Sequence, residues 1–177
     1  MKKALLVIDM QNIYFTDEML VSYPKGSLDK VLEAMDFAKA QGIPIIVVQH
    51  SSMQGGFKKG SKTWEICNQI KNKSYDYYIE KYKPSSFYET QLEDILKKEQ
   101  IDTVVISGYM THMCCDTTAR EAFHLGYYVE FLSDATGTIH LNTPGGQKQS
   151  KEIHETVLAI QASRFSKVLT VEEWKGL

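Results

Sequence analysis

Short apolar runs alternate along the chain with longer segments whose apolar residues recur every three or four positions. Most of these runs are apolar at consecutive positions and rich in β-branched residues. Such runs are typical of parallel strands that are covered on both faces. We predict six strands, at residues 4–8, 43–48, 77–80, 103–107, 128–132 and 167–170.

The segments between these runs have helical periodicity. In the clearest of them, residues 28–40, Leu28, Val31, Leu32 and Met35 share one face. We predict helices at residues 28–40, 89–98, 115–125 and 151–162. Alternating strands and helices with short connections predict right-handed βαβ units, and hence a Rossmann-like, three-layer α/β/α fold around a mainly parallel sheet. No repeat or linker divides the 177 residues, so we predict a single domain over residues 1–177.

Composition narrows the functional class. Apolar residues make up 43% and charged residues 24%, and the formal net charge is −2. A nucleic-acid or anionic-membrane partner would call for a basic face, so we expect neither. The first apolar run stops at Asp9, too early for a signal peptide. The three cysteines, two of them adjacent, form a poor disulfide framework. This pattern suits a reducing compartment, so we predict a cytoplasmic protein. We also predict no cofactor.

Three reactive side chains directly follow predicted strands. Asp9 ends the first, Lys81 ends the third, and Cys114 follows the fourth through a short loop. Ligands of open parallel sheets bind outside the carboxyl ends of the strands, so these residues are candidates for one site. The irregular segments 51–63 and 136–150 also follow strands, and we expect them to border that site.

Of the two adjacent cysteines, Cys114 fits the site better. Cys115, Ala119, Ala122 and Gly126 form a stripe of small residues at helical spacing, which suits packing on the sheet. Cys114 lies about 100° around the helix from this stripe. At a helix N-terminus we expect its thiol pKa to be lowered and nearby amides to be able to bind an oxyanion. The alternative is that both cysteines are ordinary core residues.

Asp9 and Lys81 each have a chemical and a structural interpretation. Asp9 is either a turn former at a strand end or a general base for the Cys114 thiol. Lys81 is either a solvated lysine or a cation that stabilises Asp9 and the thiolate, and Lys83 is its rival by proximity. His112 and His50 have no distinctive spacing, and we interpret both as structural or substrate-contacting residues. Predicted substrate contacts lie in strand-end segments: Tyr14, Phe15, His50, Trp64 and Tyr109.

Taken together, these segments resemble the isochorismatase-like cysteine hydrolases, which include nicotinamidases and N-carbamoylsarcosine amidases. The matching residues are 4–12 (ALLVIDMQN), Lys81 with 85–87 (SSF), 90–92 (TQL), 108–114 (GYMTHMC), 118–122 (TAREA), 126–127 (GY) and 134–135 (DA). Each segment alone is modest, but the ordered set spans residues 4 to 135 and is specific.

The resemblance implies a catalytic triad of Asp9, Lys81 and Cys114. It prefers Lys81 to Lys83 by its distance from the Ser-x-Phe element, and places the nucleophile at Cys114 through the pattern Gly-x-x-Thr-x-x-Cys. It also implies a cis peptide at Tyr109–Met110, an oxyanion hole of the Met110 and Cys114 amides, strand order 3-2-1-4-5-6, and a homo-oligomer, a dimer or larger.

One departure from the resemblance concerns metal. Nicotinamidases hold a metal through an Asp-x-His element after the second strand, whereas residues 47–52 read VVQHSS. We therefore predict no metal and disfavour nicotinamide. The expected activity is hydrolysis of a C–N bond in a small amide or carbamoyl compound. The alternatives are isochorismate-type enol ether hydrolysis, a thiol redox or sensing protein, and a catalytically idle binding subunit.

Overall fold

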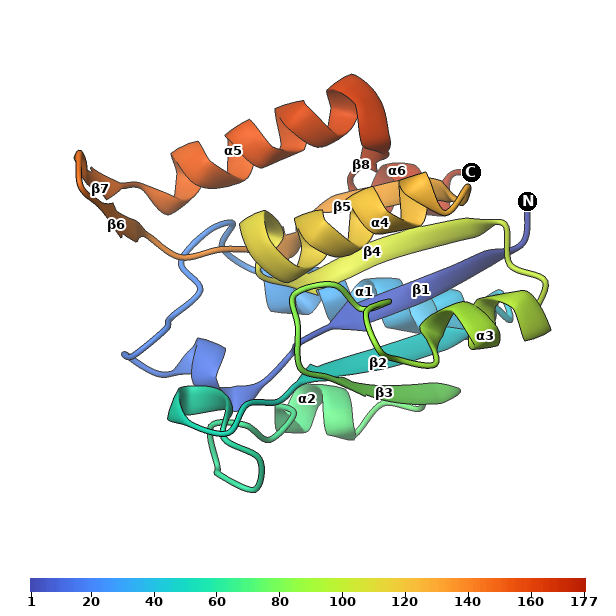
Figure 1. The fold of residues 1–177 in the computed structure, drawn as a ribbon. Helices are drawn as coiled ribbons and strands as arrows, with labels where there is room; N and C mark the ends of the chain where they lie inside the picture. The colour runs from blue at the N-terminus through green and yellow to red at the C-terminus, as the bar shows by residue number, and fades with distance from the viewer.

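The computed structural model describes all 177 residues around a six-stranded sheet (Figure 1). Its strands are β1 (Lys3–Ile8), β2 (Ile45–His50), β3 (Tyr77–Lys81), β4 (Thr103–Tyr109), β5 (Tyr128–Gly137) and β8 (Lys167–Leu169). The order is β3-β2-β1-β4-β5-β8, and every neighbouring pair is parallel. The predicted order is confirmed, with β8 as the sixth strand of the sheet.

Helices cover both faces of the sheet, as continuous apolar strands require. Successive residues of β1 point to opposite sides: Leu5 and Val7 belong to the core beneath α1 (Ser27–Ala40) and α6 (Val171–Lys175). Leu6 belongs to the core beneath α3 (Leu92–Lys98) and α4 (Asp116–His124). The predicted three-layer α/β/α fold is therefore confirmed (Figure 1).

The remaining elements surround the carboxyl end of the sheet or pack beside it. They are the 3-10 helices η1 (Asn12–Phe15) and η2 (Gly55–Phe57), the short helix α2 (Asn68–Lys71), the π-helical turns η3 (Thr111–Cys115) and η4 (Gln161–Phe165), the hairpin β6 (Leu141–Thr143) and β7 (Gly146–Lys148), and α5 (Ser150–Ile160). The hairpin projects beyond the body of the molecule, and α5 returns from it across the outside of α4 (Figure 1). No helix combines the length and apolar character that a membrane span needs.

The structure differs most clearly from the predicted elements in three places. The helix predicted at residues 89–98 begins at Leu92, because Glu89 has a left-handed backbone with φ 52°. The helix predicted at residues 115–125 is preceded by the π-helical turn η3, so helical winding starts at Thr111. The segment 136–150, predicted to be irregular, holds the end of β5 and the β6–β7 hairpin. Its Gly and Thr residues support a tight antiparallel turn, which the apolar pattern does not reveal.

Candidate functional site

Asp9, Lys81 and Cys114 meet at the carboxyl edge of the sheet. Asp9 directly follows β1, Lys81 is the last residue of β3, and Cys114 lies in the turn η3 after β4. All three side chains are buried, with residue exposures of 0%, 1% and 6%. The structure therefore brings together the three residues that the strand-end argument selected.

Gly108 lets β4 approach β1 closely enough to form this site. Its φ is +107°, and a Cβ atom at this position would collide with the backbone of Ile8. Only glycine combines that conformation with that approach. Asp9 itself has a left-handed φ of 52°, an uncommon conformation for a residue with a side chain and one that occurs at functional sites. Both features direct the end of β1 and the loop after β4 toward the same space.

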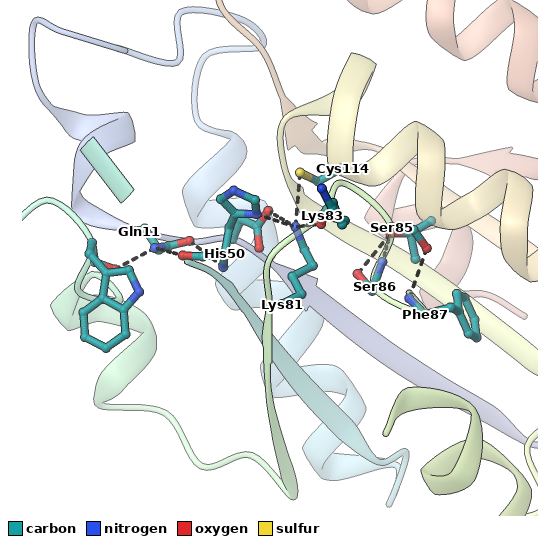
Figure 2. A network of polar contacts seen from close by, with 11 residues as sticks. Gln11, His50, Lys81, Lys83, Ser85, Ser86, Phe87 and Cys114 are labelled. Atoms are coloured by element: carbon teal, nitrogen blue, oxygen red, sulfur yellow. Dashed lines mark hydrogen bonds and ion pairs between the residues drawn. The ribbon is translucent and has the colours of Figure 1, made fainter. Parts of the chain in front are cut away.

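The Lys81 ammonium group is the centre of the polar network (Figure 2). Its Nζ atom donates to Asp9 Oδ2 at 2.8 Å and to Cys114 Sγ at 3.3 Å. It also lies 3.3 Å from His50 Nδ1 and 3.2 Å from the carbonyl oxygen of Lys83. Lys83 thus contributes its backbone, and its own side chain is exposed. The other carboxylate oxygen of the aspartate, Asp9 Oδ1, is buried without a hydrogen-bond partner in the chain.

The charges of the site correct one prediction. We expected a lowered pKa for Cys114, but burial raises the pKa of this thiol, and the neighbouring Asp9 carboxylate raises it further, against the opposing effect of Lys81. For Lys81, burial favours the neutral amine, yet the charges of Asp9 and Cys114 raise its pKa overall. The resting site therefore contains an ammonium, a carboxylate and a neutral thiol, and the thiol needs a base before it can act as a nucleophile.

His50 is held in one orientation by its neighbours. Because the Lys81 ammonium can only donate, His50 Nδ1 accepts and the ring proton sits on Nε2. Burial and the Lys81 charge lower the pKa of His50, which keeps the ring neutral. The buried Gln11 amide fixes the backbone of His50, since Gln11 Oε1 accepts from its N–H and Gln11 Nε2 donates to its carbonyl, both at 2.9 Å. The Phe57 ring meets the imidazole edge-on at 5.1 Å.

The predicted substrate contacts separate into two groups. His50, Phe15 and Trp64 keep partly exposed side chains at this end of the sheet. Tyr14 and Tyr109 are 2% and 1% exposed and belong to the core. Tyr109 makes core contacts where we predicted a substrate contact. Its hydroxyl group is hydrogen-bonded to Ser27 Oγ at 2.9 Å, and its ring packs edge-on against Tyr14 at 5.6 Å. A strand-end position does not reveal whether an aromatic ring turns toward solvent or toward the core.

The loop that carries the nucleophile has the expected backbone. The Tyr109–Met110 peptide is cis, as the resemblance implied. The Met110 carbonyl accepts from the N–H groups of Met113 and Cys115, at 3.0 and 3.2 Å, which closes the turn around Cys114. The Met110 N–H donates to no group of the chain. Cys115 is fully buried in the core beneath α4, as the stripe of small residues predicted.

A metal ion does not fit the residues of this site. Asp9, His50 and Cys114 offer ligand atoms within 4.8 Å of one another, but the Lys81 ammonium already contacts all three. A divalent cation among them would lie beside a positive charge. At the end of β2, Gln49 Nε2 donates to the Trp64 carbonyl at 2.8 Å, so this side chain adds no ligand to the three.

Sequence reasoning missed two residues that shape the site. Gln11 holds the end of β2 against the end of β1, and Phe57 packs against His50 and Tyr14. Gln11 stands two residues after Asp9, and a polar residue so close to the end of an apolar strand was a signal that could have pointed to it. Phe57 lies in the segment 51–63, and no periodicity marks its ring for this contact.

Nearly the whole chain is similar to proteins of one known family. The family model for the isochorismatase domain matches residues 3–173. Nicotinamidase 3 of Arabidopsis thaliana is 33% identical over 178 residues, which cover 92% of this chain and 82% of that protein. The isochorismatase family protein YddQ of Bacillus subtilis is 29% identical over 97% of this chain and 98% of its own.

Solved structures show the same likeness. A crystal structure from Burkholderia xenovorans LB400, assigned to the isochorismatases, superposes with a TM-score of 0.95 at 38% identity, over 99% of this chain and 86% of that one. An isochorismatase-like hydrolase from Alkaliphilus metalliredigens gives a TM-score of 0.85 at 27% identity, over 99% and 98% of the two chains. By its sequence, its strand order and its matched length, the chain belongs to the isochorismatase family of hydrolases.

Proposed function

We propose that the protein is a cysteine amidohydrolase that cleaves the C–N bond of a small amide or carbamoyl compound through a thioester on Cys114. The observation that carries this proposal is the shared Lys81 ammonium, which contacts the Asp9 carboxylate and the Cys114 thiol at once. Lys81 binds Asp9 through Oδ2, and Asp9 Oδ1 has no partner in the chain. This second carboxylate oxygen is therefore available to accept and donate protons.

In the first half of the reaction, Asp9 takes the proton of the Cys114 thiol and the thiolate attacks the substrate carbonyl. Because burial raises the pKa of Cys114, the thiolate forms only as the substrate is attacked. Lys81 stabilises the negative charge as it passes from Asp9 to sulfur and on to the carbonyl oxygen. The protonated Asp9 then gives its proton to the leaving amine, which departs and leaves a thioester.

In the second half, Asp9 takes a proton from a water molecule, and the resulting hydroxide attacks the thioester carbonyl. The acid product leaves when the C–S bond breaks, and Asp9 returns its proton to the thiolate. At the end of each half of the reaction Asp9 is again a carboxylate. We assign the Met110 and Cys114 N–H groups to the oxyanion, and the Met110 N–H, which has no acceptor within the chain, supports this.

Two relatives support the amide chemistry by name. Besides Nicotinamidase 3, the ureidoacrylate amidohydrolase RutB of Agrobacterium fabrum is 27% identical over 75% of this chain. The buried site contains one cation, Lys81, and it is paired with Asp9. We therefore expect a neutral reacting group, with His50, Phe15 and Trp64 as its contacts. A sensing role for a Cys114–Cys115 pair finds no support, because Cys115 is fully buried.

The test is a pair of cysteine variants. Cys114→Ala removes the nucleophile and is expected to abolish ammonia or amine release from a panel of small amides and carbamoyl compounds. Cys115→Ala, in the adjacent core position, is the matched control and keeps most of the activity. Intact-mass spectrometry during turnover should show an acyl adduct on the wild type and on Cys115→Ala, and none on Cys114→Ala. If Cys114→Ala still cleaves amides, the thioester mechanism is wrong. If the wild type releases pyruvate and no amine, the activity is enol ether hydrolysis.

A further inference from the structure

His154 is a buried titratable residue for which the proposed reaction has no use. It lies in α5, is 2% exposed, and contacts the turn that carries the nucleophile. Its Nδ1 atom lies 2.9 Å from Thr111 Oγ1, and Thr111 is the first residue of η3. Its Nε2 atom lies 2.9 Å from the carbonyl oxygen of Ser133 in β5. One imidazole ring thus joins α5, the nucleophile turn and the sheet.

The hydrogen-bond directions in this bridge follow from chemistry. The Ser133 carbonyl only accepts, so Nε2 carries the proton of the neutral ring and Nδ1 is an acceptor. Thr111 Oγ1 must then donate to Nδ1. Burial lowers the pKa of His154, against smaller opposing effects of the Ser133 carbonyl and Glu155, so the ring is neutral near pH 7. The hydroxyl group of Thr111 has a single direction as a result.

The bridge is connected to the reacting atoms through the backbone of η3. Thr111 follows the Met110 N–H that we assign to the oxyanion, and its carbonyl accepts from the N–H of Asp116 at the start of α4. Cys114 lies between these two points. At the far end of α5, Gln161 Nε2 donates to Asp116 Oδ1 at 2.7 Å. α5 and the turn that continues it therefore hold the nucleophile segment at both ends.

We propose that His154 is a positioning residue: by accepting from Thr111 and donating to Ser133, it sets the place of Cys114 against Lys81 and Asp9. This rests on the proposed function only in naming Cys114 as the nucleophile. The contact it governs, Lys81 Nζ to Cys114 Sγ at 3.3 Å, exists whatever the substrate. Displacements of about 1 Å in such geometry cost on the order of 100-fold in rate.

The experiment compares variants on the two sides of the bridge. His154→Leu and Thr111→Val each remove the Thr111–His154 bond and are expected to lower kcat by roughly 10- to 100-fold. His154→Gln carries an acceptor and a donor on one amide group, and Thr111→Ser keeps the hydroxyl, so both should restore most of the rate. The double variant Thr111→Val/His154→Leu should be no slower than the slower single variant.

His140→Gln is the matched control. Nδ1 of His140 accepts from the Ser150 N–H at 3.0 Å, so it also supports α5 but does not touch η3. We expect its kcat to stay within about twofold of wild type, by the near-neutral effect of changes outside the reacting geometry. Thermal unfolding of every variant separates lost positioning from lost folding. A His154→Leu enzyme that is folded and as fast as wild type, or single effects that multiply in the double variant, would overturn the proposal.

A second readout does not require a known substrate. The rate of Cys114 alkylation by iodoacetamide is measured against pH, with adducts located by mass and Cys114→Ala as the blank. In His154→Leu and Thr111→Val, Cys114 should lose its contact with Lys81, and its alkylation rate should therefore rise only at higher pH than in the wild type. The pH profiles of His154→Gln and His140→Gln should match that of the wild type. Unshifted profiles reject the positioning role. If Cys114→Ala still cleaves amides, the proposed function fails while this measurement stays decisive.

Discussion

At the scale of single residues, the buried Asp9–Lys81 pair is both the chemical centre of the site and a structural risk. Both side chains are completely buried, and Lys81 Nζ lies 2.8 Å from Asp9 Oδ2. Removing water from two charges is costly, and their attraction offsets this only while both partners are present. The pair is therefore stable as a unit, and either member alone is an unpaired charge in the core.

This argument predicts a double-mutant result. Asp9→Asn and Lys81→Met should each lower the free energy of unfolding by about 3–5 kcal/mol, and the double variant should lose clearly less than their sum. Urea unfolding measures all three. Glu93→Gln and Lys97→Met, from an exposed pair one helical turn apart, serve as the control and should cost less than about 0.5 kcal/mol. Additive losses at Asp9 and Lys81 would contradict the argument.

A second residue-scale prediction concerns alkaline pH. Burial raises the pKa of all three thiols, Cys67, Cys114 and Cys115. Below the ordinary cysteine pKa of about 8.5 their contribution to stability is complete. Above it, the unfolded chain releases thiol protons that the folded chain retains, so stability falls as pH rises. Each such thiol adds up to about 1.4 kcal/mol per pH unit to this decline.

Cys115→Ala isolates that effect. Its free energy of unfolding, measured in urea between pH 8 and pH 10.5, should fall less steeply than that of the wild type, by up to about 1.4 kcal/mol per pH unit. The cost of the missing sulfur atom is the same at every pH, and the tyrosines titrate in both proteins, so the difference in slope belongs to the Cys115 thiol. Equal slopes would show that the thiol is not held protonated by the fold.

At the scale of elements, the close approach of the parallel strands β1 and β4 at Gly108 decides whether the site forms. Gly108→Ala introduces a methyl group into the backbone of Ile8 at a φ that disfavours any side chain, and should destabilise the protein by about 3–5 kcal/mol. Gly42→Ala is the control, because Gly42 also has a positive φ, of 66°, but no atom within 4 Å of an added Cβ. It should cost about 1 kcal/mol. If the two variants unfold at the same urea concentration, the close approach is not what requires Gly108.

The same elements show how far the sequence predicts the structure. A strand that is apolar at every position, such as residues 4–8, is easily predicted from the sequence. The ends of the predicted strands locate Asp9, Lys81 and Cys114 without any resemblance. Turn chemistry is less visible. The left-handed Glu89 shortens α3, and the β6–β7 hairpin has almost no apolar content to mark it. The thiol pKa of Cys114 was predicted in the wrong direction because burial is a property of the folded site, which a helix N-terminus alone does not specify.

At the scale of the whole molecule, stability is unevenly distributed between the centre of the sheet and its carboxyl edge. Every residue of β4 is buried, as are residues 4–8 of β1, and both strands pair on two sides. Residues 142–149, which include most of the β6–β7 hairpin, are all exposed. The strand order could be predicted only from the resemblance, because the apolar pattern identifies strands but not their neighbours. Homo-oligomer formation and a cytoplasmic location remain predictions.

Native-state hydrogen exchange should report this distribution directly. Amides of β1 and β4 should exchange only through global unfolding, whereas those of residues 142–149 should exchange through local opening at a far lower free energy. An isolated two-stranded hairpin is marginally stable in water, so the hairpin depends on what packs against it. Measuring exchange at low and high protein concentration tests the oligomer as well. Protection that grows with concentration on residues 142–149 means that a second copy covers the hairpin. Strong protection at every concentration contradicts a loosely held edge, and would place the hairpin in the same cooperative unit as the strands that carry Asp9 and Cys114.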